Sequence, residues 1–212
     1  MTVSVRPMPL NQIFGGLNMV AASYVYPDRF LEEMKINSAL RDRRIFINED
    51  VSEESMFKAC YLLDRLVELD KNDGVKRDIE IILDSYGGAC YHGLSLISKM
   101  ESMRDSGYKI ITTVNSVAMS MGFMILLCGS DRRALRHSRI MCHQPSSATW
   151  GKLQDQEESV EETTALWIRM KELIIKYTNI TDEQLEDIKS RKYDWFMWSE
   201  EAIELGVIDK II

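Results

Sequence analysis

Short apolar runs alternate with helix-periodic segments along most of this chain, and this alternation constrains the fold most strongly. Residues 44–47, 79–83 and 109–114 are strand-like. Apolar residues recur at helical spacing between these runs, with Ser52 expected to begin the first such helix, and residues 120–128 form an almost wholly apolar helical segment. Strands that alternate with buried helices predict an α/β fold with a parallel sheet and packed helices.

The C-terminal third is predicted to contain one long amphipathic helix over residues 154–177. Its stripe at helical spacing comprises Val160, Thr164, Trp167, Met170, Ile174 and Tyr177. The first 26 residues, in contrast, have no period and contain Gly15-Gly16, which indicates an arm rather than core. A chain of 212 residues is short for two full domains. We therefore expect an N-terminal arm over residues 1–27 and one domain over residues 28–212.

The charge balance argues against a nucleic-acid-binding protein. Lys and Arg total 26 against 33 Asp and Glu, a net charge of −7 at pH 7, whereas such proteins present clustered positive charge. The cysteines form no CxxC pair, as expected for free thiols in a reducing compartment. The longest uncharged apolar stretch, residues 117–127, is far shorter than the ~20 residues of a membrane span. We expect a cytoplasmic protein with no membrane segment, no metal and no cofactor.

The chain has three histidines, and one of them follows a strand-like run. His92 opens a helix just past two glycines, and His137 lies among arginines in what is predicted to be a solvated turn or hairpin. His143 follows the apolar residues 140–142 and precedes Gln144-Pro145. His143 is therefore expected at a strand end, where the functional residues of parallel sheets gather.

Ser120 lies between a β-branched strand and an apolar helix, with the small residues Ala118 and Gly122 two positions away on either side. This spacing is typical of a nucleophile elbow, the sharp turn that projects a serine hydroxyl. Backbone N–H groups at a helix N-terminus can also stabilise a developing oxyanion. Ser116 has neither the helix-start position nor the following glycine. A serine helix cap would give the same local pattern, so both interpretations stay open at this point.

A second strand-to-helix junction carries Ser85-Tyr86-Gly87-Gly88. Paired glycines let the backbone approach a ligand closely and present N–H groups, although a plain tight turn is the alternative. A serine, a strand-end histidine and a glycine-rich loop are the parts that a serine hydrolase requires. The pattern does not fix the carboxylate that would orient the histidine.

Three ordered blocks carry a specific resemblance to a known family. They are residues 117–122 (VAMSMG), 141–145 (MCHQP) and 194–202 (DWFMWSEEA), followed by residues 206–209 (GVID). They resemble the serine, histidine and aspartate blocks of the ClpP family, the proteolytic subunit of the ATP-dependent Clp protease. The resemblance covers roughly residues 44–212. It implies a crotonase-like α/β fold, stacked heptameric rings and serine endopeptidase activity on unfolded polypeptides.

The resemblance also assigns roles to individual residues. It implies that Ser120 is the nucleophile, His143 the general base and acid, and Asp194 the residue that orients the imidazole. Gly88 and Met121 would donate backbone N–H groups to the oxyanion hole. The resemblance favours Asp194 over the rival carboxylates of Asp182, Asp187 and Asp209. It further implies a homo-oligomer, a tetradecamer, and a Clp-type AAA+ ATPase as partner.

Several positions depart from the family pattern. Tyr86 stands where relatives have proline in the oxyanion loop, and residues 146–151 replace a glycine-rich stretch expected to pair with substrate. Lys192-Tyr193 replaces an acidic–arginine pair that links ring assembly to active-site order. Glu80 and Ile82 occupy the strand on which relatives carry tyrosines lining the ATPase-docking cleft. An acid there would weaken burial of an apolar anchor, so the ATPase partnership is less firmly implied than the catalytic residues.

Three other functions stay open. A phage-encoded relative that matures capsid (prohead) proteins would account for the departures at the docking strand and the N-terminal arm. A non-catalytic ring subunit would be expected to have lost a catalytic residue, whereas Ser120, His143 and Asp194 are all present. A crotonase-type acyl-CoA enzyme would need a CoA pocket, for which the sequence offers no motif.

Overall fold

A computed structural model of the chain describes residues 27–212, with side chains from Phe30 onward. The expected N-terminal arm, residues 1–27, lies outside this part of the chain except for its last residue. That residue, Pro27, begins helix α3 (Pro27–Asp42), which the sequence pattern did not predict. Proline suits the first helical position, because the N–H that it lacks would have no intrahelical partner there.

The described strands form one seven-stranded sheet that is parallel except at β6. Five of them lie side by side in the order β1 (Arg44–Ile47), β2 (Ile79–Ser85), β3 (Ile110–Met119), β4 (Asp131–Ala134) and β7 (Lys210–Ile211). Two more extend the sheet from the second half of β3, namely β5 (Arg139–Cys142) and β6 (Trp195–Trp198). The predicted α/β fold with a parallel sheet is confirmed, and the antiparallel β6 is an addition to it.

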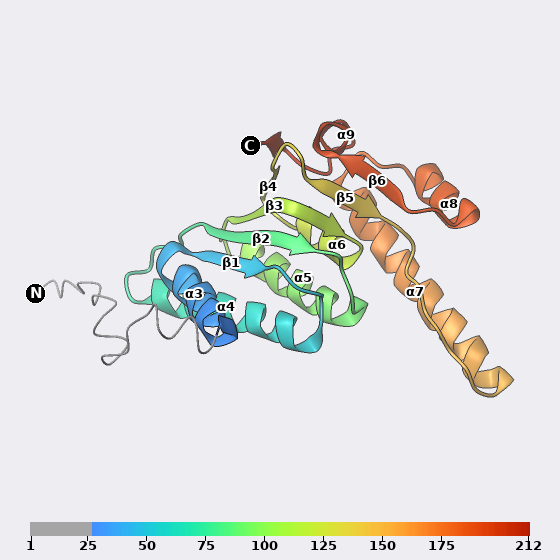
Figure 1. The fold of residues 1–212 in the computed structure, drawn as a ribbon, viewed down its shortest axis with the longest axis horizontal. Helices are drawn as coiled ribbons and strands as arrows, with labels where there is room; N and C mark the ends of the chain where they lie inside the picture. The colour runs from blue at the N-terminus through green and yellow to red at the C-terminus, as the bar shows by residue number, and fades with distance from the viewer. Residues whose placement is uncertain (1–26) are drawn as a thin grey trace, which may run out of the picture.

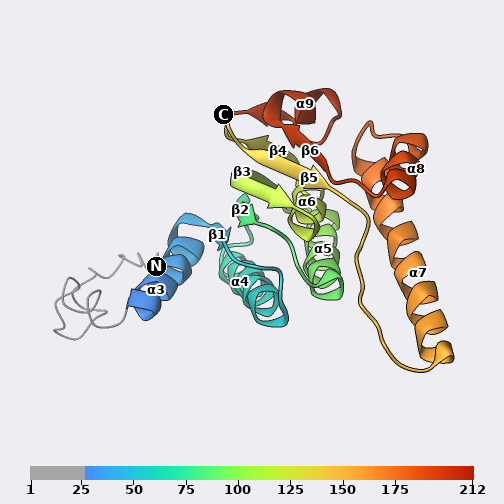
Figure 2. The same cartoon turned by 45° about the vertical axis from the view of Figure 1, so that its right-hand side comes forward.

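The remaining helices of the described chain each follow a strand, except α8, which follows α7. They are α4 (Glu53–Lys71), α5 (Cys90–Asp105), α6 (Met121–Leu127), α7 (Leu153–Tyr177), α8 (Asp182–Arg191) and α9 (Ser199–Glu204). Helices α4, α5 and α6 lie along one side of the sheet (Figure 1), and α3 lies beside the edge strand β1 (Figure 2). None of the helices in residues 27–212 is long and apolar enough to cross a membrane.

The core lies where the sheet meets α4, α5 and α6. Every residue of α6 is buried, as its apolar sequence predicts. From β2, Ile79, Ile81 and Leu83 are fully buried in the same cluster. Burial of one such side chain contributes about 1.5–3 kcal/mol before entropy is counted. The carboxyl ends of the central strands are therefore firmly held supports for the loops that follow them.

The connection between β1 and α4 is fixed by a helix cap. Ser52 is the N-cap residue of α4, as expected, and its Oγ accepts a hydrogen bond from the N–H of Ser55 at 3.2 Å. In return, Ser55 Oγ accepts from the N–H of Ser52 at 2.9 Å and donates to the carbonyl of Asp50 at 2.8 Å. This reciprocal cap satisfies backbone groups that the helix start would leave unpaired.

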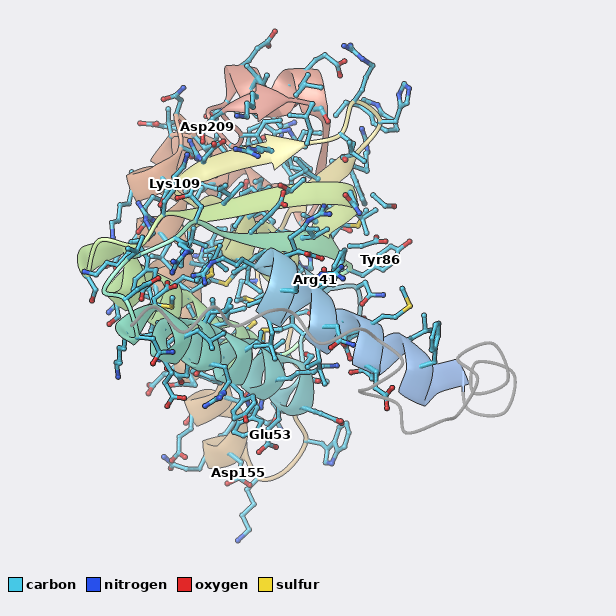
Figure 3. All side chains as sticks on the ribbon, turned by 90° about the vertical axis from the view of Figure 1, so that its left-hand side faces the viewer. Arg41, Glu53, Tyr86, Lys109, Asp155 and Asp209 are labelled. Carbon is cyan, nitrogen blue, oxygen red and sulfur yellow. The ribbon has the colours of Figure 1, made fainter. Side chains whose placement is uncertain are left out.

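Helix α7 is only partly packed against the rest of the molecule. Trp167, Met170 and Ile174 of the predicted apolar stripe are buried. Val160 is 64% exposed and Thr164 is also exposed, so the predicted amphipathic stripe is buried only in the second half of the helix. The reason is visible in Figure 1, where that half extends beyond the sheet and its helices. Asp155 marks its far end in Figure 3.

Candidate active site

Ser120 lies between the last residue of β3 and the first residue of α6. The strand continues past its β-branched residues to Met119, so it leads directly into the turn at Ser120. Ser120 has φ 53° and ψ −119°, a backbone conformation that is uncommon outside glycine. Its side chain makes no capping hydrogen bond to α6; instead, Oγ lies 2.8 Å from Nε2 of His143. This geometry is typical of a nucleophile elbow rather than of a serine cap.

His143 follows β5 at the same end of the sheet as Ser120. Met141 of β5 lies opposite Met119 of β3 in the parallel ladder, so the two strand ends bring the two side chains together. The N–H of Ser120 donates to the carbonyl of Met141 at 3.0 Å, which fastens the turn to β5. The strand-end position predicted for His143 is confirmed.

Asp194 reaches the other side of the imidazole. It directly precedes β6, and the antiparallel register that pairs Trp195 with Cys142 places Asp194 next to His143. The Nδ1 atom of His143 lies 3.2 Å from Oδ1 of Asp194. The His143 side chain is 24% exposed and that of Asp194 is 53% exposed. Hydroxyl, imidazole and carboxylate therefore form a continuous row at the surface of the molecule.

The rival carboxylates have other partners. Asp182 lies 2.7 Å from the ammonium of Lys171, and Asp187 lies 2.7 Å from the guanidinium of Arg191. Asp209 accepts a hydrogen bond from the Arg132 guanidinium at 2.6 Å on the opposite margin of the sheet from Tyr86 (Figure 3). Of the four aspartates weighed from sequence, Asp194 is the one whose carboxylate faces His143 in the described structure.

The loop after β2 lies against Ser120. Gly87 has φ 102°, and a Cβ there would lie 2.5 Å from Ser120 Cβ and 2.7 Å from the Met119 carbonyl, so only glycine fits. Gly88 is exposed, and no hydrogen bond of its N–H is found among the described residues. Met121 occupies the first position of α6, where a backbone N–H has no intrahelical acceptor. Neither N–H group therefore has a backbone acceptor among the described residues.

Other titratable groups near this site do not join the row. His92 lies on α5 and His137 lies in an exposed turn before β5, and no hydrogen bond or ion pair joins either of them to Ser120 within residues 27–212. Burial raises the pKa of the Cys142 thiol to about 12, so this neighbour of His143 stays protonated at neutral pH. The described residues contain no group of His, Cys, Asp and Glu side chains that could hold a metal ion.

Three positions that depart from the family pattern, Glu80, Ile82 and Tyr86, differ in their surroundings. Glu80 of β2 accepts hydrogen bonds from Thr113 at 2.6 Å and from Arg44 at 3.0 Å. Ile82, two residues on, is 2% exposed. Tyr86 is 69% exposed and projects at the margin of the molecule in Figure 3. Glu80 therefore lies in a hydrogen-bonded polar cluster with Arg44 and Thr113.

Sequence reasoning missed the residues that hold the glycine loop. Val51, between β1 and α4, donates its N–H to the carbonyl of Gly87 and accepts from the N–H of Ala89, both at 2.7 Å. Ser85 is 1% exposed and bonds both to this connection and to Gly87. The only sequence signal was the serine that begins Ser85-Tyr86-Gly87-Gly88; the contribution of Val51 is made by its backbone and leaves no side-chain signature.

Comparison with known proteins identifies similarity over nearly the whole chain. The family model described as Clp protease matches residues 31–212. The ATP-dependent Clp protease proteolytic subunit of Porphyromonas gingivalis (strain ATCC BAA-308 / W83) is 30% identical over 220 residues, which span 99% of this chain and 95% of that protein. The match includes every element that forms the site.

Proposed function

Because the chain belongs to the Clp protease family, we propose that it is a serine endopeptidase whose nucleophile is Ser120. The observation that carries this proposal is the row formed by Ser120, His143 and Asp194, with distances of 2.8 Å and 3.2 Å between successive side chains. These are the contacts that a nucleophile, its base and an orienting carboxylate require.

Acylation starts from the neutral imidazole. Ser120 Oγ attacks the scissile carbonyl carbon while Nε2 of His143 takes the hydroxyl proton. The carbonyl oxygen becomes an oxyanion, and the N–H groups of Gly88 and Met121 would donate hydrogen bonds to it. When the C–N bond breaks, His143 gives its proton to the leaving amine, and the acyl group stays on Ser120.

Deacylation repeats these steps with water. His143 takes a proton from a water molecule that attacks the acyl carbon, and then returns it to Ser120 Oγ as the ester bond breaks. Asp194 stays ionised throughout; it holds the proton of His143 on Nδ1, so that Nε2 faces Ser120, and stabilises the imidazolium that forms transiently. The chemistry needs no metal or cofactor.

The substrates and the assembly belong to the same proposal. The relative from P. gingivalis is by its name the proteolytic subunit of an ATP-dependent protease, and we infer that this chain likewise cuts unfolded polypeptides delivered by a Clp-type AAA+ ATPase. Self-assembly into stacked heptameric rings is supported by the projecting part of α7 and the loop before it. Trp150, Leu153 and Val160 are 86%, 72% and 64% exposed there, an arrangement expected of an interface rather than of a free surface.

Capsid maturation is the second candidate. The hydrogen bonds that Glu80 accepts from Arg44 and Thr113 favour capsid maturation, because this polar cluster is poorly suited to binding an apolar ATPase anchor. Hydrolysis of a folded capsid protein without ATPase would support capsid maturation, whereas ATP-dependent degradation with a Clp ATPase would support the first candidate. A non-catalytic ring subunit is disfavoured, because Ser120, His143 and Asp194 lie in one row.

Substitution of Ser120 tests the proposed activity. We expect the wild-type chain to hydrolyse fluorogenic peptides and unfolded casein, and Ser120→Ala to lose at least roughly 10³-fold in kcat, because no other group replaces the nucleophile. Ser116→Ala is the matched control, since Ser116 is an exposed serine on β3, the strand that leads to Ser120, and has no hydrogen bond to His143 in the described structure. Retained activity in Ser120→Ala, or equal loss in Ser116→Ala, would exclude the proposal.

A further inference from the structure

The last residue of β2 is a buried serine with two hydrogen bonds. Ser85 is 1% exposed. Its Oγ donates to the carbonyl of Glu49 at 2.7 Å and accepts from the N–H of Gly87 at 3.2 Å. One hydroxyl therefore joins the glycine loop after β2 to the connection between β1 and α4.

The same connection holds the loop at two further points. The N–H of Val51 donates to the carbonyl of Gly87, and the N–H of Ala89 donates to the carbonyl of Val51, both at 2.7 Å. There is no free space at this contact, because a Cβ on Gly88 would collide with the Val51 carbonyl. The capping box of α4 fixes the connection in turn, since Ser55 Oγ bonds to the carbonyl of Asp50. The loop thus rests on a rigid support.

The opposite side of the loop faces the nucleophile. A Cβ on Gly87 would lie 2.5 Å from Ser120 Cβ and 3.0 Å from the backbone nitrogen of Met121. The backbone of Ser85 is equally close to α6, since a Cβ on Gly122 would lie 3.0 Å from the Ser85 carbonyl oxygen. The loop is therefore held between its support and the turn that carries Ser120. Ser85 holds the peptide before Gly87 and Val51 holds the peptide after it, so a change in the φ and ψ of Gly87 would re-aim the N–H of Gly88.

We propose that Ser85 is a positioning residue for the oxyanion hole: its hydroxyl holds the N–H of Gly87, in the Tyr86–Gly87 peptide, and so restricts the backbone torsions of Gly87 that aim the N–H of Gly88 at the developing oxyanion. This inference rests on the proposed serine peptidase function. Ser85 is buried beneath the loop and acts through the backbone of Gly87 and Gly88, not by contact with substrate. Small displacements of an oxyanion donor have large effects on rate, because the bond must be in place when charge develops.

The effect of Ser85→Ala follows from what the hydroxyl does. The variant leaves the Glu49 carbonyl and the Gly87 N–H without this partner, while both Val51 hydrogen bonds remain, so the chain is expected to fold with a loosened loop. We expect kcat to fall by roughly 10- to 100-fold, less than complete loss of an oxyanion donor, with little change in KM. Affinity for a peptide boronic acid, whose tetrahedral adduct occupies the oxyanion hole, should fall by a similar factor.

Ser138→Ala is the matched control. Ser138 is also a fully buried serine, and its single hydroxyl proton is shared between the carbonyls of Val114 at 2.9 Å and Asn115 at 3.2 Å. Its removal makes the same chemical change in the same sheet without touching the glycine loop. We expect a comparable loss of thermal stability in both variants, but the loss of kcat and of boronic acid affinity only in Ser85→Ala.

The experiment combines these kinetics with hydrogen exchange of residues 86–89, measured by mass spectrometry. Faster exchange there in Ser85→Ala than in the wild type or Ser138→Ala, together with the loss of kcat at an unchanged pH profile, would support the positioning role. The positioning role would be overturned if residues 86–89 exchanged in Ser85→Ala at the wild-type rate, or if its kinetics equalled those of Ser138→Ala. If the wild type itself proves inactive, the proposed function fails, and the exchange result alone still decides whether Ser85 holds the loop.

Discussion

At the residue scale, the central feature is Ser120, whose hydroxyl does not cap the helix that follows it but bonds to a histidine. Ser120 occupies an N-cap position, yet its hydroxyl bonds to His143 instead of to α6. The small neighbours Ala118 and Gly122 indicated an elbow but left a serine helix cap open as well, and the contact with His143 distinguishes the two. The pairing with Asp194 was not predictable from spacing, because it depends on the register between β5 and β6. Only the family resemblance selected Asp194 among the aspartates.

Asp194→Asn tests the orienting role. We expect kcat to fall by roughly 10³- to 10⁴-fold with the fold intact, because an amide can donate to Nδ1 and so favours the wrong imidazole tautomer. Steady-state peptide hydrolysis measures the loss, and circular dichroism checks the fold. Asp187→Asn is the control, since Asp187 pairs with Arg191 and not with His143. Near-normal turnover in Asp194→Asn would remove Asp194 from the mechanism.

At the element scale, the site lies on loops and turns at the ends of strands, and the extent of those strands was the hardest feature to predict. The unbroken run of β-branched residues in β3 ends at Val114, but pairing with β5 extends the strand to Met119. β6 was missed because a run of four residues pairing with a distant strand has no local signature. The alternation of strands and helices was correct, because it reflects local periodicity.

Gly87→Ala tests whether the glycine loop must touch the nucleophile. Its φ of 102° and the 2.5 Å approach to Ser120 Cβ leave no room for a methyl group. We expect a loss of about 1–3 kcal/mol in the free energy of unfolding and a fall of roughly 10²-fold or more in kcat. Urea unfolding and peptide hydrolysis measure the two effects.

Gly74→Ala separates backbone strain from contact with the nucleophile. Gly74 also has a positive φ, 74°, but nothing lies within 4 Å of a Cβ placed there. We expect Gly74→Ala to lose about 1–2 kcal/mol of stability from strain alone and to keep full activity. If Gly87→Ala behaved like Gly74→Ala, the close packing of the loop on Ser120 would have no catalytic consequence.

At the scale of the whole molecule, one sheet brings three distant segments to one place. Ser120 follows β3, His143 follows β5 and Asp194 precedes β6, and the glycine loop follows β2 beside them. The sequence could predict that α7 is amphipathic but not which part is buried, because periodicity does not say what covers a stripe. Trp167 packs on the core, whereas Val160 does not. The exposed half of α7 remains available for the assembly proposed above.

The most direct test of the account is covalent labelling of the wild-type chain with a fluorophosphonate probe, read by intact mass and peptide mapping. Such a probe reacts only with a serine activated by a base and an oxyanion hole. We predict one adduct per chain, located on Ser120, absent from Ser120→Ala and retained in Ser116→Ala. No adduct on the wild-type chain, or an adduct that persists in Ser120→Ala, would contradict the assignment of Ser120 as the nucleophile.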